Sequence, residues 1–285
     1  MKLLSVGDNV IDYYVNTGEM YPGGNAVNVA VHASKIGVDA AYMGNLGTDS
    51  MSDVIRRALE KFQVETKACV TIAEASTKYC NYEVIDGERK FCNVELGKQW
   101  SGPMILNDLE LEYAKSFDVL YSSCNAKMEK EMWKLSQMPP VFAYDFGEKE
   151  KYRTEDYLGQ ICSGLDLALF SCLPMTEEEA LHFCERIASK GTKHVLITMG
   201  KTGQYVYNGS ELVYGEAKFI KPVDTMGAGD SFLAAFIYAL YQEGWRKGMH
   251  MPVETLKKAL IAGRDYSAEN CKVEGAFGYK EIIHF

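Results

Sequence analysis

The pattern best suited to chemistry is a glycine-rich segment near the end of the chain, Asp224-Thr225-Met226-Gly227-Ala228-Gly229-Asp230-Ser231-Phe232. Its small residues, 227 to 229, allow consecutive backbone N–H groups to turn toward one point, and an apolar stretch from 232 to 241 predicts a helix directly after them. Because the amino end of a helix carries a positive dipole, the segment predicts an anion hole. Asp230 lies beside this hole, where a carboxylate suits a base that accepts a hydroxyl proton during phosphoryl transfer. In the alternative interpretation, Asp230 only caps the helix and the glycines only form a tight turn.

A second glycine-containing segment, Thr198-Met199-Gly200-Lys201-Thr202-Gly203, directly follows a predicted strand. Its glycines permit a ligand to approach the backbone closely, while Thr198 offers a hydroxyl group and Lys201 a positive charge. Turns between strands are often rich in glycine, so this segment alone is a weak signal. Its position shortly before the anion-hole segment makes it a candidate part of the same site.

A third segment, Gly23-Gly24-Asn25-Ala26-Val27-Asn28, opens a predicted helix from about 25 to 36. Asn25 and Asn28 lie in the first helical turn, where their side-chain amides can reach a polyol, and Asn28 shares a helix face with His32. Asn25 is equally interpreted as a helix cap, and His32 as a core or surface histidine without a role.

Two aspartates come shortly after the first predicted strand. Asp8 and Asp12 flank the apolar pair Val10 and Ile11. Carboxylates at the carboxyl end of a strand are well placed to accept hydrogen bonds from sugar hydroxyls. Either aspartate could instead cap a turn or face solvent.

Two common nucleotide-binding motifs are disfavoured. Gly200-Lys201-Thr202 approaches the P-loop pattern, but the position that requires its upstream glycine is Val195. The dinucleotide fingerprint begins at Gly227 and Gly229 but fails at its third glycine, which is Phe232. P-loop and Rossmann sites are therefore not expected.

The segments that must position these residues alternate between strands and helices. Short apolar runs predict strands, and periodic stretches between them predict helices. This alternation is typical of an α/β fold with a mostly parallel central sheet covered by helices on both faces. The strands are expected at 3–6, 40–44, 119–122, 141–145, 167–171 and 194–198, and the helices include 25–36, 49–62 and 176–189.

One region breaks the alternation. Residues 77 to 94 predict two strands joined by a two-residue turn at Asp86-Gly87, with Cys80, Tyr82 and Val84 on one face. Residues 10 to 15 could pair with this hairpin. A small sheet outside an α/β body must cover either a cleft or a partner subunit, or it is only a surface hairpin. We expect one domain, 1–285, with a lid formed by about 10–20 and 75–97.

Composition and charge indicate which partners and which classes of protein are not expected. The 285 residues are 47% hydrophobic and 24% charged, with a formal net charge of −9 and no basic run, so nucleic acid and anionic membranes are poor partners. The longest apolar stretch, 231–241, is too short for the ~20 residues of a membrane helix. The amino terminus lacks the apolar core of a signal peptide, and the eight cysteines show no C-x-x-C spacing, which favours a cytoplasmic protein with reduced thiols and no zinc site.

The first and third of these segments resemble, on Gly23-Gly24-Asn25 and 224–232, the two signatures of the ribokinase-like (PfkB) sugar kinases, and the resemblance spans nearly the whole chain. It implies a ribokinase-like fold with the hairpin as a lid, and phosphorylation of a sugar primary hydroxyl by ATP. Within the family, 7–12 and 23–31 look most like members that act on the 6-hydroxyl of fructoselysine or a related fructosamine.

The resemblance also implies roles for individual residues. Asp230 would be the catalytic base, and the anion hole would be formed by Gly227, Ala228 and Gly229. Residues implied to bind the sugar are Asp8, Asp12, Gly24 and Asn28, with Arg89, Phe91 and Asn93 as lid contacts. Residues implied to line the nucleotide are Thr198, Gly200, Gly203, Thr225 and Asn270, the last near the adenine.

A magnesium ion is implied as well. Glu179 matches the glutamate of the family's N-x-x-E motif, which organises Mg²⁺ through water, but Thr176 stands where the motif has asparagine. Threonine can still hold a water, so we expect ATP and Mg²⁺. The resemblance also makes a monovalent cation such as K⁺ near the anion hole a candidate. A homodimer through the lid is also compatible with this interpretation.

Several functions stay open at this point. The acceptor could be another sugar, a ketose phosphate or a nucleoside, because a sequence does not define a three-dimensional pocket. A sugar or nucleotide sensor on the same scaffold is a second class, favoured by Thr176 and disfavoured by the intact segment at 227–230. A reductase is disfavoured by the missing dinucleotide fingerprint.

Overall fold

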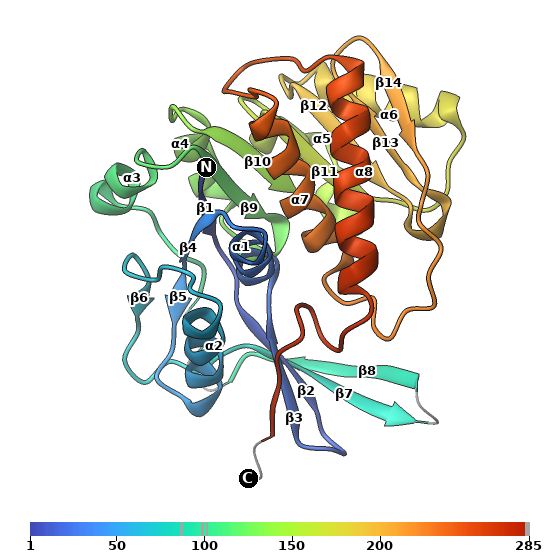
Figure 1. Ribbon diagram of the computed structural model, residues 1–285. Helices are drawn as coiled ribbons and strands as arrows, with labels where there is room; N and C mark the ends of the chain where they lie inside the picture. The colour runs from blue at the N-terminus through green and yellow to red at the C-terminus, as the bar shows by residue number, and fades with distance from the viewer. Residues whose placement is uncertain (86–87, 98–99, 101, 283–285) are drawn as a thin grey trace.

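An eight-stranded sheet forms the centre of the molecule (Figure 1). The computed structural model describes residues 1–85, 88–97, 100 and 102–282, without the side chains of 84, 85, 88 and 89. The predicted turn at Asp86-Gly87 and the side chain of Arg89 therefore lie outside the described residues. The strand order is β14-β13-β12-β11-β10-β9-β1-β4. The bounds are β1 Lys2–Val6, β4 Asp39–Met43, β9 Val119–Ser123, β10 Val141–Asp145, β11 Leu167–Ser171, β12 His194–Thr198, β13 Gln204–Tyr207 and β14 Leu212–Gly215.

The strands from β4 to β12 run parallel, and the two at the far edge, β13 and β14, run antiparallel. Parallel strands are nearly all apolar because helices cover both of their faces. Neighbouring residues point into opposite cores: Leu4 and Leu120 pack on one side, and Leu3 and Val119 on the other. The predicted mostly parallel sheet is confirmed.

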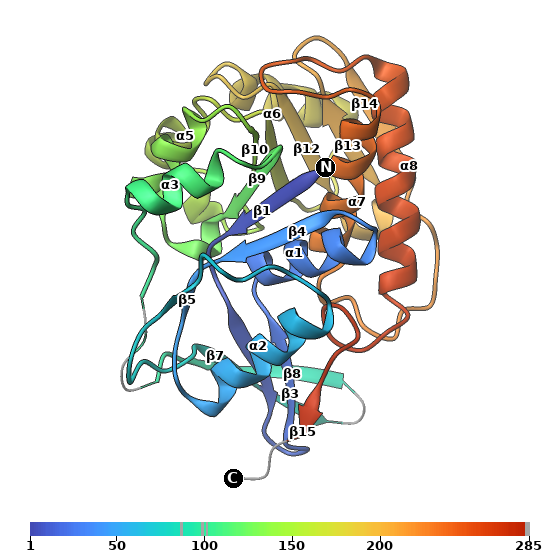
Figure 2. The same cartoon turned by 60° about the vertical axis from the view of Figure 1, so that its left-hand side comes forward.

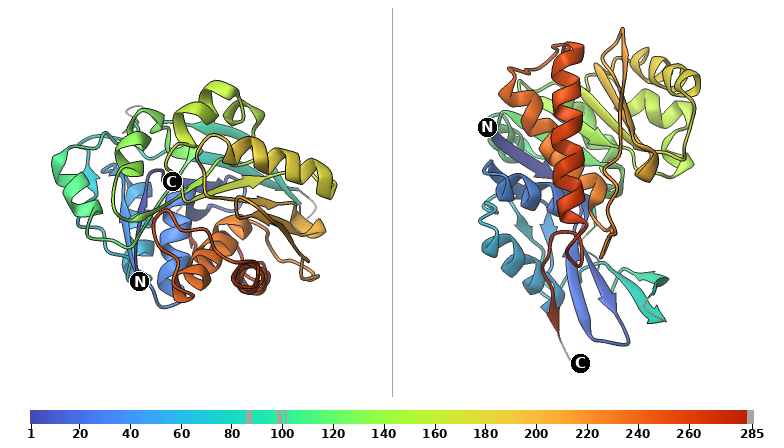
Figure 3. Two further views of the ribbon diagram at one scale, coloured as in Figure 1. Left: turned by 90° about the horizontal axis from the view of Figure 1, so that it is seen from above. Right: turned by 45° about the vertical axis from the view of Figure 1, so that its right-hand side comes forward.

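The helices form two layers around this sheet (Figure 3). One core contains apolar side chains of α3 Asp108–Ala114, α4 Met132–Ser136, α5 Glu155–Ile161 and α6 Glu177–Ala188. The other contains those of α1 Asn25–Lys35, α7 Ala228–Gln242 and α8 Val253–Asn270. A further helix, α2 Ser50–Lys61, packs with the opposite face of α1 in a third cluster. No helix in the described part of the chain combines the length and the apolarity needed to cross a membrane.

Predicted and observed bounds differ at the chemically important helix. The prediction began it at Phe232, whereas α7 begins at Ala228 with Gly227 as the N-cap. Gly227 has φ 68°, the left-handed region that favours glycine, and this conformation turns the chain into the helix. Asp230 is thus the third residue of α7, not its cap. Asp49 does cap α2, through its side chain and Ser52 N at 2.9 Å.

A second sheet lies outside the main body, as predicted for the lid (Figures 1 and 2). Its order is β15-β3-β2-β7-β8, with β2 parallel to β7 and antiparallel pairs elsewhere. The bounds are β2 Val10–Tyr14, β3 Glu19–Gly23, β7 Tyr79–Ile85, β8 Glu88–Glu95 and β15 Glu281–Ile282. A further two-stranded sheet joins β5 Asn45–Leu46 to β6 Val70–Thr71.

One face of the lid looks toward the body. Asp12 pairs with Cys80, and Tyr14 with Tyr82, so these four side chains share a face. The Tyr14 and Tyr82 rings stack with centroids 5.7 Å apart. Burial in this face raises the pKa of the Cys80 thiol to about 11, and the charge of Asp12 adds to the rise.

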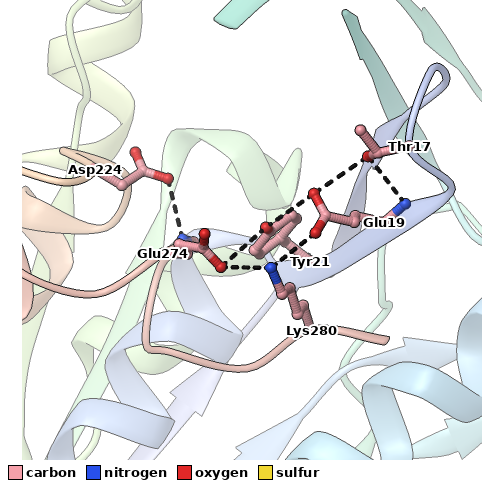
Figure 4. A network of polar contacts seen from close by, with 7 residues as sticks. Thr17, Glu19, Tyr21, Asp224, Glu274 and Lys280 are labelled. Carbon is pink, nitrogen blue, oxygen red and sulfur yellow. Dashed lines mark hydrogen bonds and ion pairs between the residues drawn. The ribbon is translucent and has the colours of Figure 1, made fainter. Parts of the chain in front are cut away.

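The C-terminal segment is fastened to the lid at the start of β3 (Figure 4). Lys280 Nζ lies 2.7 Å from Glu19 Oε1 on β3 and 2.5 Å from Glu274 Oε2. The Tyr21 hydroxyl donates to Glu19 Oε2 at 3.3 Å. Because Lys280 immediately precedes β15, these ion pairs hold the last strand against β3.

Candidate active site

Three carboxylates meet where the parallel strands end. Asp8 follows β1, Asp145 is the last residue of β10, and Asp230 lies in the first turn of α7. The carboxyl ends of parallel strands share one edge of a sheet, which is where ligands bind in open α/β folds. Helix α1 begins at the same place and brings Asn25 and Asn28.

Asp230 is held by two side-chain amides. Asn25 Nδ2 donates to its Oδ1 and Asn28 Nδ2 to its Oδ2, both at 2.8 Å. The side chain is buried, and burial raises its pKa to about 6, although the two amide donors lower it and the charge of Asp8 raises it. A carboxyl group with this pKa is largely ionised near neutral pH yet more basic than an exposed aspartate, which suits a general base.

Asp145 is a second buried acid in the site, and the sequence analysis did not single it out. Burial raises its pKa to about 7, and the charges of Asp230 and Asp8 add to the rise, whereas a hydrogen bond from Gly147 N at 2.7 Å lowers it. Asn25 Nδ2, which donates to Asp230, also lies 3.4 Å from Asp145 Oδ2. A signal was available, because Asp145 ends a predicted strand at the binding edge of the sheet.

The glycine-rich segment forms a tight loop that packs closely on its neighbours. A Cβ atom on Gly227 would lie 2.7 Å from Ala276 O, so the loop packs directly on the segment after α8. Asp224 shapes the loop by accepting hydrogen bonds from Met226 N at 2.9 Å and Gly275 N at 3.0 Å (Figure 4). Ala228 N donates to Thr225 O at 3.2 Å. The first turn of a helix leaves N–H groups without intrahelical partners, so the start of α7 is suited to hold an anion.

A cavity of about 320 Å³ joins this loop to the carboxylates. Its lining combines the predicted anion hole, the base and polar groups from the ends of β9, β10 and β11. The lining residues are Asn25, Cys124, Asn125, Asp145, Gly147, Glu148, Lys149, Tyr152, Ser171, Thr225, Gly227, Ala228, Gly229 and Asp230. The sequence analysis missed the members from 124 to 171, because each stands alone in a loop without a neighbouring motif.

The predicted sugar ligands lie beside this cavity. Asp8 accepts hydrogen bonds from Asn25 N at 3.3 Å and from Ala26 N and Ser123 Oγ at 3.4 Å. It lines a second cavity of about 20 Å³ with residues that include Lys78 and Trp100. Gly24, with φ 102°, packs on Asp8, because a Cβ atom there would lie 2.8 Å from Asp8 O. Asp12 is farther out, on the lid.

The predicted lid contacts are not at the cavity. Phe91 is 53% exposed and its ring lies edge-on to Tyr82, with centroids 5.6 Å apart. Asn93 is exposed and accepts a hydrogen bond from Asn81 Nδ2 at 2.7 Å. Neither residue lines one of the two cavities.

The predicted nucleotide ligands divide into two groups. Thr225 lines the large cavity, whereas Thr198, Gly200 and Gly203 lie at and after the end of β12 without lining it. The Thr198 and Ser171 hydroxyl oxygens are 3.4 Å apart, which places Thr198 next to the cavity wall. Asn270 is buried, and its Nδ2 donates to Ala276 O at 2.8 Å, so it supports the segment beneath the anion hole.

His32 supports the same segment. Its ring is fully buried, with Nε2 3.0 Å from Ala276 O and Nδ1 3.2 Å from the Tyr266 hydroxyl. Because a carbonyl oxygen only accepts, Nε2 carries the proton and Nδ1 accepts from Tyr266. Burial, followed by the charge of Lys35, lowers the pKa of His32 to about 3, so the ring is neutral. His32 therefore links α1 to the loop beneath Gly227.

The predicted magnesium ligand is turned toward its own helix. Thr176 and Glu179 form a capping box at the start of α6, where Glu179 Oε2 accepts from Thr176 N at 2.7 Å and Thr176 Oγ1 at 2.9 Å. These bonds lower the pKa of Glu179, which is exposed and lines neither cavity. The described residues contain no group of three or more His, Cys, Asp or Glu side chains suited to a metal. The oxygen-bearing side chains that line the cavity include Asp145, Glu148 and Ser171.

Comparison with known proteins supports the interpretation drawn from these residues. The family model for pfkB family carbohydrate kinases matches residues 3–137 and 161–278. The chain is 30% identical to fructosamine kinase FrlD from Bacillus subtilis, covering 98% of this chain and 94% of that protein. It is 26% identical to fructoselysine 6-kinase from Escherichia coli, covering 96% and 99%.

Solved structures share the fold. Arabidopsis thaliana ribokinase complexed with ribose and ATP matches with a TM-score of 0.81 and 19% identity, over 97% of this chain and 94% of that one. A putative ribokinase II from E. coli in complex with ATP and Mg²⁺ matches with a TM-score of 0.76 and 16% identity, over the same shares. The two signature segments, the lidded sheet and the family match agree: the chain belongs to the PfkB family and is a carbohydrate kinase.

Proposed function

We propose that this kinase transfers the γ-phosphoryl group of Mg-ATP to the 6-hydroxyl of fructoselysine or a related fructosamine. The observation that carries the proposal is the position of Asp230, a buried carboxylate in the first turn of α7 and held by two amides. The acceptor class rests on the two named relatives, which act on fructosamines and match along nearly the full chain.

In this mechanism Asp230 accepts the proton of the sugar hydroxyl as the hydroxyl oxygen bonds to phosphorus and the bond to the ADP oxygen breaks. Asn25 and Asn28 fix the carboxylate in place, since each holds one of its oxygens. The N–H groups around Gly227 and Gly229 stabilise the charge on the transferred group. Removing one such donor typically costs ~2.7–4 kcal/mol of transition-state stabilisation.

Sugar contacts are assigned to the residues on both sides of Asp230. Asp8, Gly24 and Asn28 belong to the inner wall, where the carboxylate of Asp8 is within reach of the first turn of α1. Asp12, Arg89, Phe91 and Asn93 belong to the lid and contact the sugar once the lid closes over it. If so, Asp12→Ala raises KM for the sugar and leaves KM for ATP unchanged; an unchanged sugar KM removes Asp12 from the pocket.

The nucleotide is assigned to the other end of the cavity, with Thr225 at the phosphates and Thr198, Gly200 and Gly203 along the nucleotide. Mg²⁺ prefers oxygen ligands and keeps several waters, so few protein groups are needed. Asp145 is one of the carboxylates at the cavity and is our candidate for such an ion, and Glu179, outside the cavity lining, is the candidate that acts through water. Comparing the Mg²⁺ dependence of Asp145→Asn and Glu179→Gln identifies which of them holds it. A K⁺ requirement is tested by replacing K⁺ with a bulky organic cation.

The lid provides a surface for a second copy of the chain. Its outer strand β8 forms the edge of the five-stranded sheet, and Phe91 and Val94 are about half exposed on it. We propose that the body and lid work as one unit and that two lids pair. Light scattering after size exclusion should give the dimer mass for the wild type and a monomer for Val94→Asp; a wild-type monomer contradicts the pairing.

The central experiment measures ADP release with Mg-ATP and a panel of acceptors. The panel contains fructoselysine, other fructosamines, fructose, ribose, fructose phosphates and nucleosides. Fructoselysine should give the highest kcat/KM, and Asp230→Asn should lower kcat by ~10²–10⁴. The matched control is Asp156→Asn, the same chemical change at an exposed site on α5, which should leave kcat unchanged.

Each result of that experiment has a defined meaning. Highest kcat/KM with a nucleoside or a free sugar would replace the fructosamine assignment and keep the role of Asp230. Near-normal turnover by Asp230→Asn would remove the base from the mechanism. Binding of sugar and ATP without ADP release by the wild type would contradict the proposed reaction itself.

A further inference from the structure

An asparagine outside every recognised motif contacts the residue that holds the base. Asn125 follows β9 in a short 3-10 turn, 124–126, in which Ser123 Oγ accepts from Asn125 N at 3.3 Å. The next but one residue, Lys127, has φ 58° and ends this turn in the left-handed region. The turn directs the Asn125 side chain across the cavity, where Nδ2 donates to Asn25 Oδ1 at 2.7 Å.

This contact determines which way the Asn25 amide points. A carboxamide has an acceptor at one end and a donor at the other. Because Asn125 occupies the oxygen end of Asn25, the NH₂ end must face the carboxylates, and Nδ2 lies 2.8 Å from Asp230 Oδ1 and 3.4 Å from Asp145 Oδ2. If the amide were reversed, its oxygen would face two carboxylates and raise the cost of ionising them.

We propose that Asn125 is a positioning residue that sets the basicity of Asp230 through Asn25. The proposal rests on the proposed function in one respect only, the assignment of Asp230 as the base. Asn125 reaches Asp230 through a single intervening side chain and is not itself a catalytic residue.

The surroundings of Asp230 explain why one amide matters. The charge of Asp8, after β1, raises the pKa of Asp230, and the charge of Asp230 in turn raises the pKa of Asp145 on β10. All three carboxylates raise the pKa of the buried Tyr121 hydroxyl on β9. Lys149 lines the same cavity. The donors to Asp230 are Asn25 and Asn28 on α1. Asn28 Oδ1 has no hydrogen-bond partner among the described residues, so only Asn25 has its orientation set by a third side chain.

The test measures Asp230 directly, without turnover. Carboxyl ¹³C chemical shifts of labelled aspartate are followed from pH 4 to 9 in the ligand-free protein, and Asp230→Asn and Asp145→Asn variants assign the two signals. Asn125→Ala removes the donor and should raise the Asp230 midpoint by several tenths of a pH unit. Asn125→Asp, of the same shape, replaces the donor with an acceptor and should raise it further, because Asn25 then turns its NH₂ group away from Asp230.

A double-mutant cycle separates an effect of Asn125 that passes through Asn25 from a direct effect of Asn125 on Asp230. Asn25→Ala alone should raise the midpoint, and adding Asn125→Ala to it should change nothing more. In the Asn25→Ala background, Asn125→Asp should raise the Asp230 midpoint only through its added negative charge. This rise should be smaller than the rise that Asn125→Asp causes in the wild-type background. Full additivity of Asn25→Ala and Asn125→Ala, or an unchanged Asp230 midpoint in Asn125→Ala, would overturn the inference.

Kinetics then connects the inference to the reaction. In the variants, the acidic limb of kcat/KM should move to higher pH by the same amounts as the NMR midpoints. Matching NMR and kinetic shifts support both assignments. An NMR shift without a kinetic shift would keep the effect of Asn125 on Asp230 through Asn25 but would remove Asp230 as the base. The failure of this inference and the failure of the proposed function are therefore distinguishable.

Discussion

Replacing Asp145 with asparagine should stabilise the folded protein, and only above about pH 4. The side chain is buried, and its pKa rises from 3.8 to about 7, chiefly through burial and then through the charge of Asp230. At 1.36 kcal/mol per pKa unit, this rise corresponds to up to roughly 4 kcal/mol of folding free energy. Asparagine has nearly the same shape and can still accept the hydrogen bond from Gly147 N.

The direction follows from proton linkage. The folded state binds the Asp145 proton more tightly than the unfolded chain does. The stability that the protonated Asp145 gives the folded state is therefore fully present below pH 3.8 and is lost as the pH rises through about 7. Asparagine does not titrate. The variant should therefore match the wild type near pH 4, gain stability between pH 4 and 7, and reach a constant advantage of roughly 2–4 kcal/mol by pH 8.

Urea denaturation followed by tryptophan fluorescence measures this difference, since Trp245 is fully buried in the folded state. Titrations at pH 4.5, 6 and 8 are compared for the wild type, Asp145→Asn and the exposed control Asp156→Asn. The control should differ from the wild type by about the same small amount at each pH. An Asp145→Asn difference that stays constant with pH, or that shrinks as the pH rises, would show that Asp145 is not held in an unfavourable charged state.

Two further substitutions test the support beneath the anion hole. Gly227→Ala should lower both the stability and kcat, because φ 68° costs ~1–2 kcal/mol for alanine and its Cβ would lie 2.7 Å from Ala276 O. Gly229→Ala meets nothing within 4 Å and should unfold close to the wild type in the same urea titration; equal losses for both would refute the packing argument. His32→Leu should cost ~1–3 kcal/mol by leaving Ala276 O with one donor fewer, whereas the exposed control His182→Leu should be nearly neutral in thermal unfolding.

The main sheet was predictable because its strands are short apolar runs. The predicted strand at 141–145 coincides with β10, since burial on both faces leaves a continuous apolar pattern. The antiparallel edge strands β13 and β14 were not predicted, because their four-residue lengths and turn-like surroundings carry little periodicity. The lid was predicted from its turn residues and its alternation.

The site was predictable where its residues are contiguous. The anion hole and Asp230 lie within nine residues, so their spacing alone indicated chemistry. Asn125 and Lys149 reach the cavity from separate loops, and no local pattern distinguishes them from surface residues. The resemblance implied ligand contacts for Asn270 and Glu179, and these contacts stay predictions. In the structure Asn270 Nδ2 donates to Ala276 O and Glu179 accepts from Thr176.

The junction between lid and body has a mechanical consequence. Strand β3 ends at Gly23 and α1 begins at Asn25, so Gly24 alone separates a lid strand from the helix whose Asn25 and Asn28 hold Asp230. Since the N–H groups of Asn25 and Ala26 both donate to Asp8, a swing of the lid should loosen or tighten these two bonds. Deuterium uptake at the Asn25 and Ala26 amides should therefore report the position of the lid in solution when the sugar binds.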